Sequence, residues 1–303
     1  MIVRSLHDKS ELDLLVSLSR KTAVTAQWIG GMLDYGDTRP EWCRMAFGAG
    51  GELRAAHALH SWRPDGSPAQ VALLGHRDPA AAEELLRHDL SHLAGDSLGA
   101  QIAVYDDGTP AVAELRAEQS EVVGRAGFRV TVSRVMLGRP AATIPVPDRL
   151  SFRPARSEPV HQLRQLFRAV GDGSLDHEMR SVRASSDKDA EAAFRLDRAL
   201  GRDFRDDWFV VGVNGSGAPV GYVQSAVSGD RAILAEIGVA APERGNGYVN
   251  DLLAYGTAVL SGFPAVVSTT DEANTPMRTA FARAGYAETG SRTDFEWDRP
   301  RLT

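Results

Sequence analysis

The sequence has one cysteine, no long apolar run and no excess of positive charge. Cys43 has no partner for a disulfide within the chain, which suits a reducing compartment. No stretch approaches the roughly 20 apolar residues that cross a bilayer, and the charged N-terminal sequence MIVRSLHDKSELD cannot supply the apolar core of a signal peptide. We therefore expect a cytoplasmic protein with no membrane contact.

The chain also lacks the features of several ligand-binding classes. It carries 34 Lys and Arg against 40 Asp and Glu, a formal charge of -6. Binding to a nucleic-acid backbone needs clustered basic residues, so no nucleic-acid partner is expected. Neither the phosphate-loop motif GxxxxGK(S/T) nor the nucleophile turn GxSxG occurs. A small and cationic substrate fits this charge better.

The length of 303 residues suits two domains. Residues 138–150, GRPAATIPVPDRL, contain three prolines and no apolar periodicity, which indicates a linker. We predict one domain over residues 1–138, a linker over 139–149 and a second domain over 150–303.

The two halves resemble each other. VVGRAGFRVTVSRVML (122–137) is similar to AFARAGYAETGSRTDF (280–295), and each half begins with a strand-like segment, IVRSL or SFRPA. Each half then shows a strand, a Gly-rich turn and a second strand. An internal duplication of one fold is therefore expected.

The pattern of apolar residues in the second half predicts helices that flank a mixed sheet, which is an α/β (α+β) fold. A hairpin over 208–227 leads to the apolar strand AILAEIGV (232–239). Apolar residues then recur at three- and four-residue spacing through Val249, Leu252, Leu253 and Gly256, one stripe of an amphipathic helix. FPAVVS predicts another strand, and 274–283 a helix with Pro276 in its first turn.

The loop between this strand and helix, AAPERGNG, predicts an anion site. A strand that turns directly into a helix exposes unpaired amides at the positive end of the helix dipole. Gly245 and Gly247 would let a phosphate approach the backbone, and Arg244 would add a cation. The alternative is that the glycines only make a tight turn.

These segments resemble the GCN5-related N-acetyltransferases. The acyl-CoA loop of that family reads Arg/Gln-x-x-Gly-x-Gly/Ala, and the sequence from Arg244 to Val249 fits at Arg244 and Gly247 but has Val249 at the last small position. IGVAAPE before it and NTPMRTAFARAGY after it are also similar to the family, in family order. In layout the two halves resemble tandem acetyltransferases such as mycothiol synthase.

The resemblance implies acetyl-CoA as co-substrate and a set of residues that bind it. The strand end would offer backbone to the pantetheine arm, the loop would hold the diphosphate, and a later asparagine would lie beside the arm. The residues that the resemblance implies are Ile237, Gly238, Val239, Arg244, Gly245, Asn246, Gly247, Tyr248, Val249, Asn250 and Asn274.

The reaction implied is direct attack of an amine, here a primary amine of a small molecule, on the thioester. Glu236 is the candidate base because it is the only charged residue in AILAEIGV. Burial in such a run favours the protonated acid and so suits it to accept a proton. The alternative is a solvated carboxylate or a partner for a structural arginine.

No proton donor for the leaving thiolate stands out. The family often has Tyr four residues before the closing Gly, where this chain has Phe281. Ser225, Thr269, Thr270 or a water could serve, or the thiolate could leave unprotonated, because thiols are fairly acidic. Carboxylates expected near the acceptor amine are Asp176, Glu178, Asp206 and Asp207, unless these are ordinary solvated loop residues.

The first half lacks the glycine loop and is interpreted as a degenerate copy. After VALL it reads GHRDPAAAEELL, in which Asp78 and Pro79 form an N-cap and first-turn pair. An anionic Asp78 would repel a diphosphate.

A metal site is not expected. HDLSH places His88 and His92 one helical turn apart, the spacing of zinc pairs, but no third ligand is evident. The rival to an enzyme is a non-catalytic acyl-CoA-binding or regulatory module, which Val249 and Phe281 favour. A monomer or a homodimer is expected.

Overall fold

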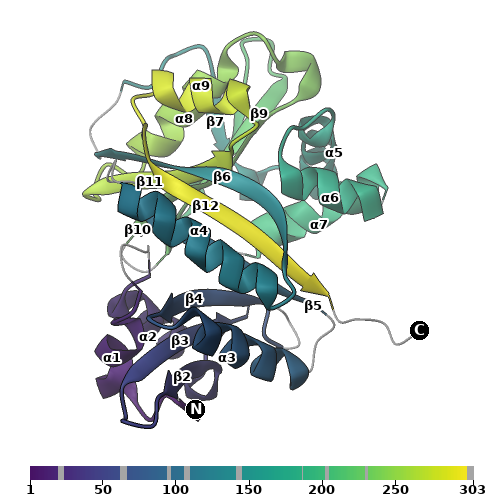
Figure 1. Ribbon diagram of the computed structural model, residues 1–303. Coiled ribbons are helices and arrows are strands. Elements are labelled where there is room, and N and C mark those ends of the chain that lie inside the picture. Colours follow the sequence, from purple (N-terminus) through teal and green to yellow (C-terminus); the bar gives the residue numbers. More distant parts are fainter. Residues whose placement is uncertain are drawn as a thin grey trace. The chain divides into compact units, whose positions relative to one another are not determined.

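The computed structural model describes residues 1–19, 24–61, 67–93, 97–105, 110–140, 145–185, 187–201, 205–228 and 231–298. The chain forms two compact units (Figure 1). The first comprises Met1–Arg134 together with Thr289–Thr303, and the second comprises Val135–Glu288.

The first unit is a mixed sheet with helices on both faces. Its strands follow the order β1-β2-β3-β4-β5-β12-β6, in which β4 and β5 pair in parallel and the other pairings from β1 to β12 are antiparallel. The strands are β1 (Ile2–Ser5), β2 (Cys43–Phe47), β3 (Leu53–His60), β4 (Gln70–His76), β5 (Ser97–Tyr105), β6 (Arg129–Pro140) and β12 (Ala287–Asp298). The helices are α1 (Leu12–Val16), α2 (Ala26–Tyr35), α3 (Pro79–Ser91) and α4 (Pro110–Arg125).

Successive side chains along a strand point to opposite faces of the sheet, so the apolar core of this unit has one part on each face. Met45 packs with α1 and α2 through Leu15 and Ile29, while its neighbour Ala46 packs with α3 through Leu85. Both faces are therefore buried, which explains why β3 reads as a nearly continuous apolar run.

The second unit repeats this plan. Its strands follow the order β6-β11-β10-β9-β8-β7, with β10 and β11 parallel and the pairings from β7 to β10 antiparallel. The strands not yet given are β7 (Ser151–Pro154), β8 (Phe209–Val213), β9 (Pro219–Ser228), β10 (Arg231–Val239) and β11 (Ala265–Asp271). The helices are α5 (Val160–Gly171), α6 (His177–Ser185), α7 (Lys188–Leu200), α8 (Tyr248–Ala258) and α9 (Thr275–Arg283).

Two clusters of apolar side chains cover the faces of the second sheet. On one face α8 and α9 contribute Leu252, Leu253 and Phe281. On the other face α5 and α7 contribute Phe167 and Leu196. The helices and strands predicted for this half, including the hairpin and the helix that begins with Pro276 in its first turn, are confirmed.

The duplication is visible in two pairs of glycines. Gly75 in β4 and Gly238 in β10 each lie so close to another segment that a Cβ would collide with it. The Cβ would lie 2.8 Å from the carbonyl carbon of Leu18, in the turn after α1, or 2.2 Å from Val170 Cγ1 in α5. Gly127 and Gly285, at matching points of the similar tails, both have positive φ, 103° and 80°. The mixed α/β fold in two copies is confirmed.

The units differ at their ends from the predicted domains. The boundary falls inside β6, whose residues Arg129–Arg134 belong to the first unit and Val135–Pro140 to the second. Likewise Thr289–Asp298 of β12 belong to the first unit, although they follow the second half in sequence. The predicted linker 139–149 begins within β6, because the strand continues to Pro140; residues 141–144 lie outside the described residues.

Within the part of the chain that the structure describes, no helix is long and apolar enough to span a bilayer.

Candidate functional site

The candidate site lies where the pairing between the parallel strands β10 and β11 ends. The two strands pair only at Ala232–Val266 and Ile233–Val267 among the described residues, yet β10 continues to Val239 and β11 to Asp271. A bulge in β10 between Leu234 and Glu236 coincides with the end of the pairing. The strand ends therefore leave backbone on the facing edges of β10 and β11 that does not pair across the gap.

The loop after β10 presents unpaired amides. A short 3₁₀ turn over Ala241–Glu243 is followed by Gly245 and Gly247, with φ of 84° and 77°, and α8 starts at Tyr248. Among the described residues, no acceptor receives a hydrogen bond from the amides of Gly245 through Val249. Such amides at a helix N-terminus form a site for an anion.

The ends of this loop are tied internally. The amide of Arg244 donates to Ala241 O (3.4 Å) and the amide of Asn250 to Gly247 O (3.0 Å), although both residues are in the predicted cofactor set. The guanidinium of Arg244 donates to three carbonyls, at Val239 (3.2 Å), Gly173 (3.3 Å) and Val170 (2.7 Å), and burial lowers its pKa. Three of its five N–H donors are thus used to fasten the loop to the end of α5.

The other predicted cofactor residues lie around this loop. Val249 packs against the core below α8, so its side chain is directed away from the loop that carries the unpaired amides. Asn274 is the N-cap of α9, where its side chain accepts from the amide of Met277 (3.4 Å). Ile237 and Val239 pack against the α8–α9 core from the end of β10.

The corresponding turn of the first unit is closed. There β4 leads to α3, and the carboxylate of Asp78 accepts from the amides of Ala80 (3.0 Å) and Ala81 (3.2 Å). The donors that are unpaired in the second unit are here capped by a side chain of the same helix. The structure therefore supports the interpretation that this copy lacks the anion site.

Glu236 is not an isolated acid in an apolar strand. Its side chain is 10% exposed and lies toward α7, where Arg198 Nη2 donates to Oε1 (3.2 Å) and Arg195 Nη2 lies 3.9 Å from Oε2. Two guanidiniums therefore lie beside this carboxylate, one within hydrogen-bond distance. The expected apolar environment is therefore wrong, because α7 supplies partners that the strand alone does not reveal.

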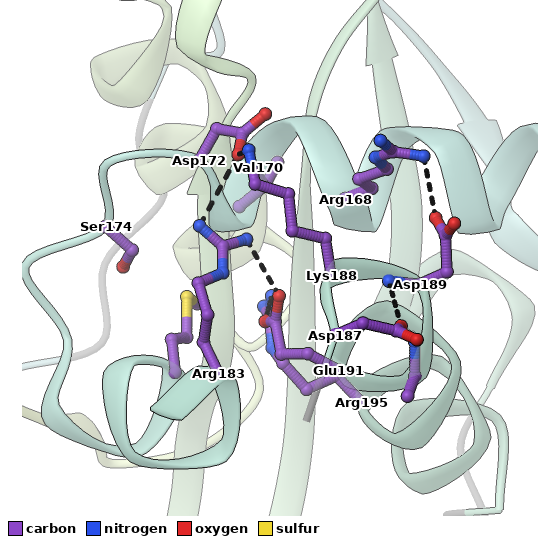
Figure 2. A network of polar contacts seen from close by, with 12 residues as sticks. Arg168, Val170, Asp172, Ser174, Arg183, Asp187, Lys188, Asp189, Glu191 and Arg195 are labelled. Carbon is purple, nitrogen blue, oxygen red and sulfur yellow. Dashed lines mark hydrogen bonds and ion pairs between the residues drawn. The ribbon is translucent and has the colours of Figure 1, made fainter. Parts of the chain in front are cut away.

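Arg195 belongs to a larger polar network at α5, α6 and α7 (Figure 2). Glu191, fully buried, accepts from Arg195 (3.1 Å) and Arg183 (2.9 Å), and Asp172 accepts from Arg183 (3.4 Å) and Lys188 (2.6 Å). Acidic and basic side chains thus alternate in a continuous series of contacts that runs from the exposed Lys188 to the buried Arg195.

Arg195 connects this network to the sheet. Its guanidinium donates to the hydroxyl of Tyr222 on β9 and lies 5.2 Å from the ring of Phe167, which stacks on Tyr222. Burial raises the pKa of Tyr222, so this phenol stays neutral.

The four carboxylates predicted near the acceptor amine are all engaged. Asp176 caps α6 through the amide of Met179 (3.0 Å), and Glu178 pairs with Arg198. Asp206 lies 3.7 Å from Arg156, and Asp207 pairs with Arg205 at 2.9 Å. Glu178 shares Arg198 with Glu236.

The hydroxyls of Tyr286 and Ser225 form hydrogen bonds within the second unit. Phe281 is 1% exposed and packs edge-on against Tyr286, whose hydroxyl is 2.7 Å from Thr257 Oγ1 and whose pKa burial raises to about 12. Ser225 Oγ donates to Gly256 O (2.9 Å). Thr270 is buried in β11 and Thr269 is partly buried.

Two residues that hold the loop were not predicted from the sequence. Arg149, just before β7, contacts the carbonyl side of the loop, and Asp251 in the first turn of α8 holds its guanidinium. The available signal was Asp251 itself, the only charged residue of α8, which needs a cation because it is buried.

The two histidines of HDLSH lie side by side, as their spacing predicts. His88 and His92 stack at 4.7 Å between ring centroids on the surface of α3. Within the described ranges no group of three or more His, Cys, Asp or Glu side chains could hold a metal ion.

Comparisons with known proteins rest on structure alone. No protein-family model and no curated protein matches the sequence. A GCN5-related N-acetyltransferase from Sphaerobacter thermophilus is similar over 99% of this chain and 96% of its own, with a TM-score of 0.63 and 16% identity.

Two further structures are similar over most of the chain. A tandem protein of this family from the clavulanic acid biosynthesis pathway covers 100% of both chains, with a TM-score of 0.59 and 16% identity. A GCN5-related N-acetyltransferase from Kribbella flavida covers 91% of this chain and 96% of its own, with a TM-score of 0.55 and 16% identity. The chain has the tandem fold of the GCN5-related N-acetyltransferases.

Proposed function

We propose that this chain is an N-acetyltransferase whose second unit binds acetyl-CoA and acetylates a primary amine of a small molecule. The observation that carries the proposal is the row of unpaired amides from Gly245 to Val249, directly after a strand that parts from its neighbour. Anionic diphosphate fits this row, because each oxygen can accept from backbone N–H groups at the positive end of α8.

Acetyl-CoA, when bound, supplies a thioester whose acetyl carbon forms a bond to the amine nitrogen as the C–S bond breaks. The residues of the chain then have three tasks: to bind the carrier, to polarise the carbonyl and to take a proton from the amine. The loop amides serve the first task, and backbone of β10 beyond Ile233 that does not pair with β11 supports the second.

Glu236 is our proposed proton acceptor, directly or through a water. Its pairs with Arg198 and Arg195 fix the direction of its carboxylate. The proton that it accepts can reach the thiolate through solvent, because thiols are acidic enough to leave without a fixed donor. Glu178, which shares Arg198 with Glu236, is our candidate for the carboxylate that recognises the amine.

The first experiment tests carrier binding with matched glycine variants. Gly245 and Gly217 both have φ of 84° and open space where a Cβ would be, so Gly245→Asp and Gly217→Asp impose the same backbone strain. Only Gly245→Asp adds a negative charge to the amide row, and we expect it to abolish calorimetric binding of acetyl-CoA while Gly217→Asp preserves it. Absence of binding to the wild-type protein would end the proposal.

The second experiment tests the chemistry. Thiol release is measured with a panel of primary amines for the wild-type protein and Glu236→Gln. Loss of a general base lowers kcat by about 10² to 10⁴, with acetyl-CoA affinity unchanged. An unchanged kcat for Glu236→Gln would remove Glu236 from the mechanism.

The alternative function is a non-catalytic acyl-CoA-binding module. Two observations favour it: Phe281 offers no proton, and Glu236 is bound by structural arginines. Acetyl-CoA binding without thiol release on any amine would decide for this alternative.

A further inference from the structure

Arg149 grips the loop from the side opposite to its unpaired amides. Its Nη1 donates to Asn246 O (3.1 Å) and its Nη2 to Gly247 O (3.2 Å). Its Nε donates to Asp251 Oδ1 (3.2 Å), and the same carboxylate accepts from Nη2. One guanidinium therefore joins two loop carbonyls to the first turn of α8.

Because Arg149 binds two loop carbonyls, it also fixes the direction of the amides in the same peptides. In a trans peptide the C=O and the following N–H point in opposite directions, and no described peptide is cis. Asn246 O shares its peptide with the amide of Gly247, and Gly247 O shares its peptide with the amide of Tyr248. Because Arg149 holds both carbonyls, the amides of Gly247 and Tyr248 face away from it.

Asp251 fixes the guanidinium in turn. The carboxylate has no exposed surface, whereas the side chain of Arg149 is 49% exposed. A buried anion without its partner is strongly unfavourable, so Asp251 keeps Arg149 in place. The ring of Tyr248, 5.5 Å from the guanidinium carbon, adds a further contact.

Arg244 and Arg149 hold different parts of the loop. Arg244 ties the loop to the end of α5 through three carbonyls. Arg149 holds the carbonyls of the next peptides, those that carry the amides of the anion site. The conformation of the amide row is thus set by bonds on its carbonyl side before any ligand arrives.

We infer that Arg149, held by Asp251, is a positioning residue that sets the affinity of the second unit for the diphosphate of CoA. The inference rests on the proposed function. It also predicts which part of the ligand senses the residue: the diphosphate does, and the pantetheine arm does not.

The test compares CoA with pantetheine, which lacks the diphosphate. CoA binding is measured by calorimetry and pantetheine binding by ligand-observed NMR. The variants are Arg149→Met/Asp251→Asn, which removes the pair without leaving a buried charge, and Arg149→Lys, which keeps the charge but not the fork. Arg153→Met is the matched control: this arginine is 47% exposed and pairs with Glu158 at 3.0 Å, away from the loop.

We expect CoA to bind about 10- to 100-fold more weakly to both Arg149 variants, since bonds to charged groups from two misaligned amides are weakened. Pantetheine affinity is expected to be unchanged in all proteins, and Arg153→Met to behave as the wild type. Full CoA affinity in either Arg149 variant overturns the inference. So does an equal loss for CoA and pantetheine, which would indicate a merely structural role.

The result for the wild-type protein separates this inference from the function on which it rests. If the wild-type protein binds no CoA, both the proposed function and the inference fail. If it binds CoA and the Arg149 variants bind it equally well, the inference alone fails.

Discussion

Glu191 offers the sharpest test of what holds α7 to the rest of the second unit. Its carboxylate is completely buried between Arg195 (3.1 Å) and Arg183 (2.9 Å), whose side chains are 5% and 25% exposed. Glu191→Gln keeps the shape and removes the charge, which leaves the buried Arg195 with a weaker partner. Breaking a buried ion pair on one side costs about 3 to 5 kcal/mol, and the retained amide hydrogen bond argues for about 3 kcal/mol.

The expected change in melting temperature follows from the size of the unit. For a domain of about 150 residues, each kcal/mol shifts Tm by about 2 to 4 °C, so Glu191→Gln is expected to lower Tm by about 6 to 12 °C. Calorimetry at pH 7 measures it. The control is Asp189→Asn, two residues earlier on α7, which removes an exposed pair with Arg168 at 2.8 Å (Figure 2) and so changes Tm little. Equal shifts for the two variants would refute the reasoning.

Two further predictions concern packing and pH. Gly238→Ala places a Cβ 2.2 Å from Val170 Cγ1 and is expected to lower the free energy of unfolding by about 1 to 3 kcal/mol, whereas Gly262→Ala, with open space at its Cβ, changes it little in the same urea titration. Burial alone would raise the pKa of Asp89, but the hydrogen bonds with His57 and His88 and the charges of His57 and Arg44 together outweigh it, and the pKa is lowered to about 2. A carboxylate whose pKa is lowered in the folded protein stabilises the fold at pH values above its unfolded pKa of about 3.9, and this contribution is lost as the pH falls towards the folded pKa. The difference in free energy of unfolding between the wild type and Asp89→Asn should therefore be largest at pH 5 and decrease towards pH 2. A difference that stays constant over that range would contradict this.

The order of elements around the candidate site could be predicted because each has a local cause. The apolar run of β10, the two glycines with positive φ and the apolar stripe of α8 are all read from neighbouring residues. The N-cap at Asp78 was equally local, since an Asp-Pro pair before an Ala-rich segment needs no distant partner. Local signals thus located the loop and separated the two copies.

The partners of the charged residues could not be predicted. Glu236 meets Arg198 and Arg195, which come from a helix about 40 residues earlier, and Arg244 meets carbonyls at the end of α5. Sequence spacing does not encode such contacts, because they depend on how helices cross the sheet. A lone acid in an apolar strand therefore indicated a buried charge but not what neutralises it.

The sequence also did not predict that β12, which follows the second half, completes the sheet of the first unit, while the end of β6 belongs to the second unit. The tails that form β6 and β12 are similar in pattern, so either could serve either sheet. Alternation of side chains specifies that a segment is a strand but not which neighbour it joins. Only contacts such as Thr131 Oγ1 to Asp294 O (3.0 Å) reveal the actual pairing within the first unit.

This exchange affects how the protein is made. The second unit is continuous from Val135 to Glu288, whereas the first needs Thr289–Asp298 to complete its sheet. A ribosome adds roughly 5 to 20 residues per second, so the N-terminal unit waits on the order of 10 to 30 s for its final strand, and the second unit is synthesised during that interval. During that interval β5 lacks the strand β12 with which it pairs in the finished protein, and an unpaired strand edge is a template for pairing with another chain.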